Sequence, residues 1–482
     1  MTSEVRMKKI VIIAAIVLLV ALIISALFIF VIPMKKYQHA NELMASGNYM
    51  QAAAEFANLE DYKDSAKLVL KCKYLEADRL EKSDRKAAAA MAFGAISDYS
   101  DARERSFRLW DDIAIRPTYE IGSYHAVAIQ NDGSVLAQDR VDDSSKINTT
   151  VSAWQNVISV QAGRFHCFAL CSDGTVLSTR NNDDCLAWTD IVSIYVHTGW
   201  DGDTLVGLKA DGTVLYQPNT MFFENQRGQD NVSAWRNIVA VSCTDSHTVG
   251  LRSNGTVIAI GDNAKGQCNT ESWTDIIAIA TDTEMTIGLR ADGTLLIASD
   301  SFPPESSDVK NWSDLVAIEA HLDSFIGMRS DGTLLYSGST SNGRDECLTW
   351  SDVSTIQSGP LGPIAVTQSG TFLFTPVLGN LAWFTFINDW SDIKLPLTSS
   401  FVDLDHLLVF DHQAELNLPD SGFYNAFGTP TTVCAHNGCK NYIAKFGDTN
   451  CCTLHSARCQ NCYCYIDEDA IYCMKCIKEA LK

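Results

Sequence analysis

The sequence predicts a multi-domain, mainly β protein built around a seven-bladed β-propeller. Two observations lead to this fold class: tryptophans recur through the middle of the chain, and a D/N/S-G-T/S turn follows most of them. The steps between successive turn glycines are 41, 38, 43, 38, 39 and 38 residues, and a period near 40 is typical of propellers. The tryptophans are Trp110, Trp154, Trp188, Trp235, Trp273, Trp312, Trp350 and Trp390, and the glycines are Gly133, Gly174, Gly212, Gly255, Gly293, Gly332 and Gly370.

Each repeat reads as a set of short strands. In the repeat that opens at Trp235, the runs IVAV, TVGL and TVIAI are rich in β-branched residues, and Asn-Gly separates the last two. Because Gly accepts the positive φ of a tight turn, this pattern predicts a hairpin. A fourth strand from the segment before the next tryptophan is expected to complete each blade. The blades must then stack into a closed ring to bury both of their faces.

The sequence is compatible with two numbers of blades. The eighth hairpin, at residues 406–418, lacks the glycine turn, and Trp110 also fits as the end of a preceding helix. We therefore predict seven blades, closed by mixing the first and last strands, with eight blades as the alternative. The predicted domains are residues 1–36 (cytoplasmic tail and transmembrane helix), 37–110 (helical repeats), 111–420 (β-propeller) and 430–482 (a Cys-rich module).

A single-pass membrane anchor is predicted at the N-terminus. Residues 10–32 form an uncharged run of 23 residues, which as a helix spans roughly 34 Å, enough to cross the hydrocarbon layer. Three basic residues before the run (Arg6, Lys8 and Lys9) outweigh the two after it, which predicts a cytoplasmic N-terminus and an extracytoplasmic body. The clustered thiols near the C-terminus argue for the opposite side, because thiols stay reduced in the cytosol.

Residues 37–110 are predicted to form a second, helical repeat. Residues 37–64 align with residues 74–101, and nine of eleven compared positions are identical or similar. The spacing of apolar residues and the break at Gly47 indicate two helix-turn-helix units, which resemble tetratricopeptide repeats. Two units are few for such an array, so we expect them to pack on the propeller or on a partner.

Charge and cysteine usage exclude some classes of protein. The net charge is −21, and residues 111–429 alone carry 40 acidic against 15 basic side chains. Such a surface repels phosphate backbones, which disfavours nucleic acid as a partner of the propeller. Seven cysteines are scattered singly before the C-terminal tail, which is unlike a disulfide framework.

The repeats also resemble a known family. The strings W-x-D-I-V-A-I, H-T-V-G-L-R-S-D-G-T-V and G-D-N-x-x-G-Q-C are similar to the bacterial form of the RCC1-type (regulator of chromosome condensation) repeat. The resemblance covers residues 111–420 and implies a β-propeller, usually of seven blades. It places Cys268 where that form often carries a packing cysteine. It implies no single activity, because the family includes a nucleotide-exchange factor, enzyme inhibitors and lectin-like or scaffold proteins.

Candidate site residues in the propeller are few. Four histidines recur at one repeat position, but Thr204, Met285 and Ser324 occupy it elsewhere, which favours a structural role at a strand start. No catalytic triad, carboxylate pair or phosphate loop stands out. The insertion at residues 221–229 interrupts the repeat, and such insertions usually lie on a propeller's binding rim. Its candidate partner contacts are Phe222, Phe223 and Arg227, and the four histidines are His125, His166, His247 and His406.

The C-terminal module carries the clearest chemical pattern. Its residues read C-x4-C-x12-C-x2-H and C-x2-C-x10-C-x2-C, which suits tetrahedral zinc because each short pair supplies two ligands from one tight turn. The module resembles zinc-ribbon and treble-clef-like tails, with two structural Zn²⁺ ions; disulfides are the alternative. The ligands are Cys434, Cys439, Cys452 and His455 for one ion and Cys459, Cys462, Cys473 and Cys476 for the other, with Cys451, Cys464 and His436 as competitors.

Together these patterns predict a membrane-anchored binding or scaffold protein that presents a β-propeller for protein–protein recognition, without catalysis. The alternative is a cell-surface carbohydrate-binding or hydrolytic protein, which should show carboxylate pairs that converge at the ring centre. A zinc tail that reads nucleic acid is disfavoured by the near-neutral charge of residues 430–482, with six basic and five acidic side chains. The sequence does not identify the protein partner.

We expect residues 430–482, expressed alone, to bind two Zn²⁺ ions and to lose their fold when a chelator is added. The reason is that a chain this short depends on the metal for its folding free energy. Elemental analysis and circular dichroism measure both effects. Absence of metal, or cysteines found paired by mass spectrometry, would contradict the prediction.

Overall fold

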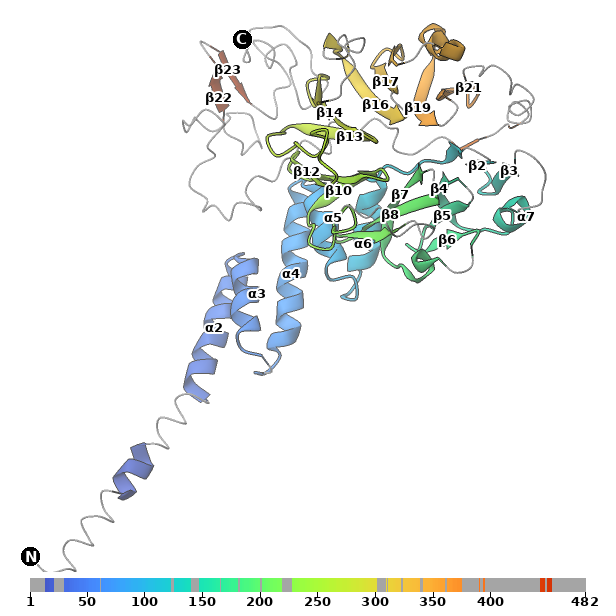
Figure 1. The fold of residues 1–482 in the computed structure, drawn as a ribbon. Coiled ribbons are helices and arrows are strands. Elements are labelled where there is room, and N and C mark those ends of the chain that lie inside the picture. Colours follow the sequence, from blue (N-terminus) through green and yellow to red (C-terminus); the bar gives the residue numbers. More distant parts are fainter. Residues whose placement is uncertain are drawn as a thin grey trace, which may run out of the picture.

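The computed structural model of this chain contains a helical stem, a ring of β-sheets and a separate two-stranded sheet (Figure 1). The structure describes residues 14–20, 30–60, 62–122, 125–139, 147–164, 166–180, 183–199, 202–218, 228–300, 309, 311–321, 324–338, 341–359, 362–374, 390 and 393–394, and the backbone of 443–446 and 449–452.

The helical stem repeats its own internal contacts. The Tyr37 hydroxyl donates a hydrogen bond to Asp64 at 2.5 Å, and the Tyr74 hydroxyl donates one to Asp101 at 2.6 Å. Each of these tyrosine rings also packs on a phenylalanine and on a second tyrosine. The repeat in the sequence therefore corresponds to a repeat in contacts, and its likeness to tetratricopeptide units stays a prediction. The helices are α2 (Ile32–Ala45), α3 (Tyr49–Ala57), α4 (Ser65–Lys82), α5 (Lys86–Gly94) and α6 (Ala102–Asp111).

Seven antiparallel three-stranded sheets make up the described part of the ring, and consecutive strands pair within each sheet. The strands are β1 (Tyr119–Ile121), β2 (His125–Ile129), β3 (Val135–Asp139), β4 (Val157–Ala162), β5 (Cys167–Cys171), β6 (Val176–Ser178), β7 (Ile191–Gly199), β8 (Gly202–Lys209), β9 (Val214–Gln217), β10 (Ile238–Cys243), β11 (His247–Arg252), β12 (Val257–Gly261), β13 (Ile276–Asp282), β14 (Met285–Arg290), β15 (Leu295–Ala298), β16 (Leu315–His321), β17 (Ser324–Arg329), β18 (Leu334–Ser337), β19 (Val353–Gly359), β20 (Gly362–Thr367) and β21 (Phe372–Phe374). Separately, β22 (Ile443–Phe446) pairs with β23 (Thr449–Cys452).

The expectation of a fourth strand per blade is wrong for the described segments. The chain before a tryptophan forms α7 (Ile147–Val151) or a 3-10 helix at Asp184–Ala187 and Ser341–Thr349. After β12 it forms turns, because side chains satisfy the backbone N–H groups that a strand would pair. The Asp262 carboxylate accepts the N–H of Ala264 at 3.0 Å, and the side-chain amide oxygen of Asn263 accepts that of Cys268 at 2.8 Å.

The two sequence signatures of the repeat meet within a sheet. The Asp or Asn two positions after six of the tryptophans adopts a left-handed backbone, as at Asp190 with φ of 60°, a region that Asn and Asp tolerate better than other non-glycine residues. Its carbonyl accepts the N–H of Ala210 at 2.8 Å, next to the turn at Gly212, whose φ is 76°. The signature therefore ties the start of the first strand to the turn between the second and third.

The recurring tryptophans pack between neighbouring sheets. Trp188 belongs to an apolar cluster that includes Leu170 of β5 and Leu205 of β8, from two successive sheets. A Cβ at Gly207 would lie 2.7 Å from Cζ3 of Trp188, so glycine is needed for the ring to lie on the strand. The equivalent pairs in other sheets are Gly250 with Trp235, Gly288 with Trp273 and Gly327 with Trp312.

The first and last described sheets pack on each other. Tyr119 of β1 and Phe372 of β21 contact edge to face, with ring centroids 5.1 Å apart. The chain beyond β21 then returns to the first sheet, where the Lys394 N–H donates to the Ile129 carbonyl at 2.8 Å. Residues from the two ends of the domain therefore meet at one seam.

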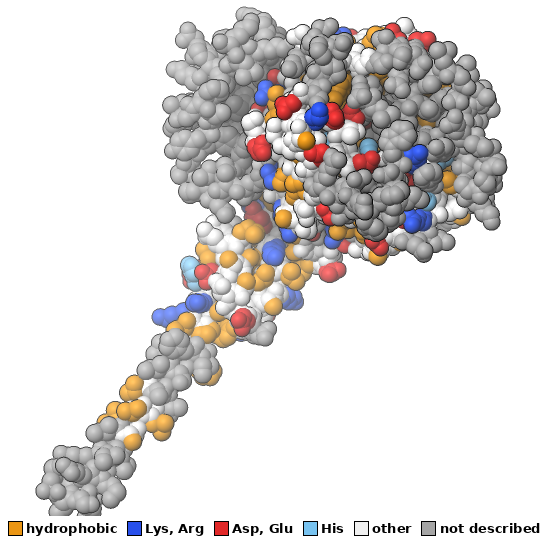
Figure 2. All heavy atoms as spheres, in the orientation of Figure 1, with side chains coloured by type: hydrophobic (Ala, Val, Ile, Leu, Met, Phe, Trp, Pro, Cys, Tyr) orange, Lys and Arg blue, Asp and Glu red, His pale blue; other side chains and the backbone are white. Residues whose placement is uncertain are grey.

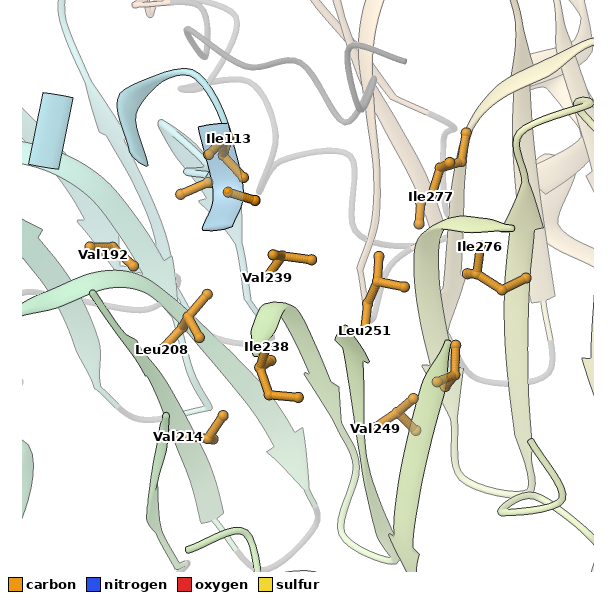
Figure 3. Packing of buried hydrophobic residues seen from close by; sticks show 14 of the residues in the cluster. Ile113, Val192, Leu208, Val214, Ile238, Val239, Val249, Leu251, Ile276 and Ile277 are labelled. Atoms are coloured by element: carbon orange, nitrogen blue, oxygen red, sulfur yellow. The ribbon is translucent and has the colours of Figure 1, made fainter. Parts of the chain in front are cut away.

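The second helical unit packs on the ring. Trp110 lies in α6 and so ends a helix, and its indole N–H donates to the Ala210 carbonyl at 2.8 Å. Arg103 donates to the Asp173 carbonyl at 2.9 Å and pairs with Asp190 at 3.1 Å. Figure 3 shows Ile113, just after α6, within the same apolar cluster as residues of β7, β8 and β10. Helices and sheets thus share one core.

None of the described helices is long and apolar enough to span a membrane. Of the predicted anchor, residues 14–20 are helical and residues 30–32 lead into α2. Residues 10–13 and 21–29 lie outside the described residues.

Replacing Trp273 with Ala is expected to lower the free energy of unfolding of the ring by about 3–5 kcal/mol, because a buried aromatic that separates two sheets is lost. Chemical denaturation followed by circular dichroism measures the change. Leu348→Ala is the control, since that side chain is half exposed and should cost far less. Equal effects of the two substitutions would place Trp273 outside the packed core.

Candidate functional site

The antiparallel sheets give the ring two different faces. We call the first strand of each sheet its inner strand. The face that meets the helices, the helix-side face, carries the start of each inner strand and the turns between second and third strands, because both sit at the same end of an antiparallel sheet. The stem contacts this face through Asp173, Asp190 and Ala210. The opposite, distal face carries the loops between first and second strands.

A cavity of about 130 Å³ occupies the centre of the ring, and all seven inner strands line it. One position of each inner strand, here called the channel position, pairs in the same register with its neighbouring strand; Glu120 opposite Val127 and Glu319 opposite Ile326 are examples. Side chains alternate along a strand, so a shared register brings these seven residues to one level of the cavity. The channel positions are Glu120, Gln161, Tyr195, Ser242, Ala280, Glu319 and Gln357.

Two of the channel positions are carboxylates with strongly shifted pKa values. Burial raises the pKa of Glu120 to about 8, and the nearby charges of Glu319 and Asp203 act in the same direction. Burial also raises the pKa of Glu319 to about 8. Both side chains are half-buried and line the cavity, where the surrounding protein disfavours their charged forms.

On the distal face, histidine and carboxylate side chains join successive sheets. His166 pairs with Asp203 at 3.3 Å, and His197 pairs with Asp245 at 3.6 Å. His247 is fully buried and hydrogen-bonds the Thr286 hydroxyl at 2.9 Å. Burial, together with the charge of His197, lowers the pKa of His247 to about 4. Contacts of this kind stabilise the assembly of the ring.

The recurring histidines therefore take up structural positions where they are described. His125 is buried, and its ring hydrogen-bonds the His166 carbonyl at 3.1 Å, across to the next sheet. His406 lies outside the described residues. Cys268 is buried among the turns after β12, in keeping with a packing role.

The predicted partner contacts Phe222, Phe223 and Arg227 lie outside the described residues, as do seven of the eight predicted zinc ligands. The eighth, Cys452, ends β23, whose side chains are not described. Gln217 and Gly228, which flank the insertion, are described. Gln217 ends the third strand of its sheet, and antiparallel pairing places that end at the distal face.

Sequence reasoning missed the carboxylates of the cavity, although a signal was present. In six repeats the channel position is the seventh residue after the tryptophan, as Glu319 follows Trp312 and Gln357 follows Trp350. A charged or amide residue at this place interrupts an otherwise apolar strand. Glu120 has no preceding tryptophan at that spacing and could be found only from the pairing of β1 with β2.

Comparison with known proteins places one part of the chain in a family. Residues 238–267, which span β10 to β12 and the segment after them, match the model of the regulator of chromosome condensation (RCC1) repeat. No curated protein matches the chain. The match and the ring of sheets make the body of this chain an RCC1-like β-propeller.

Three solved structures illustrate the likeness. A chain in the crystal structure of Kap60 bound to yeast RCC1 (Prp20) is 14% identical to this protein. The match covers 46% of this chain and 69% of the other, with a TM-score of 0.34. The CRINKLY WD40 ectodomain of the Arabidopsis thaliana receptor kinase ACR4 is 16% identical over 59% and 97%, with a TM-score of 0.36. The C-terminal domain of gp131 from bacteriophage phiKZ is 10% identical over 60% and 99%, with a TM-score of 0.34.

The raised pKa of Glu319 predicts a dependence of stability on pH. Between its ordinary pKa, near 4.5, and about 8, the folded state holds a proton that the unfolded state has lost, so stability falls as pH rises through this window. Glu319→Gln should therefore raise the melting temperature more at pH 8.5 than at pH 6.5. Both pH values lie at or above the ordinary pKa of His247, near 6.5, so titration of His247 adds little to the difference in stability between them.

Thermal unfolding of the two proteins at the two pH values measures the effect. Glu271→Gln is the matched control, because it removes the same charge from an exposed site. A gain for Glu319→Gln that does not depend on pH would contradict the prediction.

Proposed function

We propose that this protein is a membrane-anchored recognition protein that presents the distal face of a seven-bladed propeller to a protein partner. The observation that carries the proposal is the one-sided docking of the stem. Trp110, Arg103 and Ile113 fix the helices to the helix-side face through a shared core. A rigid stem on one face orients the other face away from the N-terminus, as a presenting scaffold requires.

Exposed apolar side chains support the anchor. In the N-terminal helix at residues 14–20, the side chains from Ile16 to Val20 are between 47% and 64% exposed. Figure 2 shows hydrophobic atoms over this helix. A helix that is apolar all round needs burial in a protein core or in a membrane, and no described residue covers this one. The uncharged run of residues 10–32 fits the membrane.

The seam between the end sheets supports a ring of seven blades. Gln357 of β19 donates to the Tyr119 carbonyl of β1 at 3.4 Å, and side chains of these two sheets form one apolar cluster. Contact between the first and last inner strands favours closure without an eighth sheet. We further propose that the body is extracytoplasmic and that the C-terminal module holds two structural Zn²⁺ ions. Protease added to intact cells tests the first proposal, because a body that survives it lies inside.

A hydrolytic function is the second candidate, because two carboxylates do converge at the ring centre. Two features favour recognition over hydrolysis. Glycoside hydrolysis needs one protonated and one ionised carboxyl group, whereas the pKa values of Glu120 and Glu319 are both raised to about 8. A cavity of about 130 Å³ is also smaller than ordinary ligand pockets, which begin at about 300 Å³.

Site-specific photo-crosslinking in cells tests recognition by the distal face. A photoreactive phenylalanine analogue at Glu284, an exposed residue of the distal β13–β14 loop, is expected to crosslink the full-length protein to a partner. The same analogue at Glu271, exposed near the start of β13 on the helix side, is the control. Crosslinks from position 271 alone, or from neither position, would overturn the proposal.

A further inference from the structure

Three hydrogen-bond acceptors occupy neighbouring channel positions. Glu319, Gln357 and Glu120 lie on β16, β19 and β1, which follow one another around the ring. Each pairs with the same register position of its neighbouring strand, opposite Ile326, Ile364 and Val127 respectively. We call these three side chains the acceptor triad. They form one continuous polar side of the cavity.

Each member of the acceptor triad has an oxygen that no described residue uses. One carboxylate oxygen of Glu120 accepts the Ala162 N–H at 2.8 Å, and the other accepts no described donor. The Gln357 amide donates its N–H to the Tyr119 carbonyl, and its own oxygen is buried without a partner among the described residues. The carboxylate of Glu319 has no hydrogen-bond partner among those residues. The oxygen of Gln357 is buried, and a buried acceptor without a donor is costly, whereas Glu120 and Glu319 line the cavity.

The remaining channel positions have partners or need none. The Gln161 side-chain oxygen accepts the Val196 N–H at 2.8 Å. The Ser242 hydroxyl hydrogen-bonds the Thr281 hydroxyl at 2.7 Å and also interacts with Tyr195. The channel position of β13 is Ala280, which has no polar atom in its side chain. The unused acceptors are therefore confined to the acceptor triad.

We propose that the central cavity binds a protonated primary amine, whose three N–H bonds the acceptor triad accepts. An ammonium group has three donors and no acceptor, which matches three acceptors on one side of a small cavity. A guanidinium group is planar with five donors and fits less well. A Ca²⁺ ion takes six to eight oxygen ligands, more than the acceptor triad offers.

The two carboxyl groups of the cavity also favour a positively charged ligand. Without a cation, burial keeps the pKa values of Glu120 and Glu319 near 8, so both carboxyl groups are largely protonated at neutral pH. A positive group between them lowers both pKa values. As the ammonium group binds, one carboxyl group releases a proton to solvent, so the net charge of the cavity does not change.

The ligand would enter from the distal face. On the helix side, the linker from α6 to β1 crosses the inner strands: the Pro117 carbonyl accepts the Ser159 hydroxyl at 2.9 Å, and the Ile115 carbonyl accepts the Ser193 hydroxyl at 2.8 Å. The distal end of the cavity is lined by Gly122 and Thr198 instead. This proposal does not depend on recognition of a protein by the distal face, since a free amine would satisfy the same three acceptors.

Isothermal titration calorimetry on the full-length protein in detergent micelles tests the proposal. The probes are n-butylammonium chloride and lysine blocked at both its α-amino and carboxyl groups, with calcium chloride as the comparison cation. We expect saturable one-to-one binding of at least one amine, with proton release visible in buffers of different ionisation enthalpy. Tighter binding of butylammonium indicates a free amine, and tighter binding of blocked lysine indicates a side chain of a partner.

Glu319→Gln is the primary variant, because Glu319 has no described hydrogen bond to lose. It should weaken amine binding about tenfold or more, because it replaces one charge-assisted hydrogen bond by a neutral one. Gln357→Met should weaken binding as well, through loss of a neutral acceptor. Glu271→Gln, which removes an exposed carboxylate, should leave the affinity unchanged. Absence of saturable amine binding, equal affinity of Glu319→Gln and the wild type, or binding of calcium that amines do not displace would overturn the proposal.

Discussion

The packing of the recurring tryptophans between sheets sets the geometry of the ring. Where Trp188 lies against Gly207, the missing Cβ lets the indole fill the space between two sheets, and the same pair recurs in the sheets of β11, β14 and β17. In the other three described sheets alanine takes the place of this glycine. Because a small residue occupies the position each time, we expect successive sheets to be related by a similar rotation. The inner strands then converge on one axis, and a small enclosed cavity follows from closure.

The stem depends on the same repeat. The carbonyl of Ala210, next to the turn at Gly212, accepts the indole N–H of Trp110. A Cβ at Gly94 would overlap that carbonyl, so α5 approaches the ring as closely as backbone allows. A turn made for pairing two strands thus also serves as the docking point of the helices. Contacts of this kind bury one side of the second helical unit against the ring and fix its direction.

Much of this fold could be read from the sequence, because its determinants are local. The recurring tryptophan and the turn glycine each depend on one residue type, so their period predicted the sheets. The fourth strand was predicted wrongly, since side chains such as Asn263 satisfy backbone groups through turns that periodicity does not reveal. The acceptor triad depends on three strands far apart in the chain, and only the closure of β19 on β1 brings Gln357 next to Glu120. The zinc ligands stay predictions.

Ala280 gives the strongest reason to seek a ligand in the cavity. It occupies the same channel position as Glu120 and Glu319, in the same register and between equally well-packed sheets. A small apolar residue is therefore compatible with the inner strand, and the fold itself does not require carboxylates there. Enclosing two carboxyl groups with unused acceptors lowers stability, because they lose hydration without gaining protein donors. An interaction that the folded ring alone does not supply, such as a bound cation with three donors, would offset that loss.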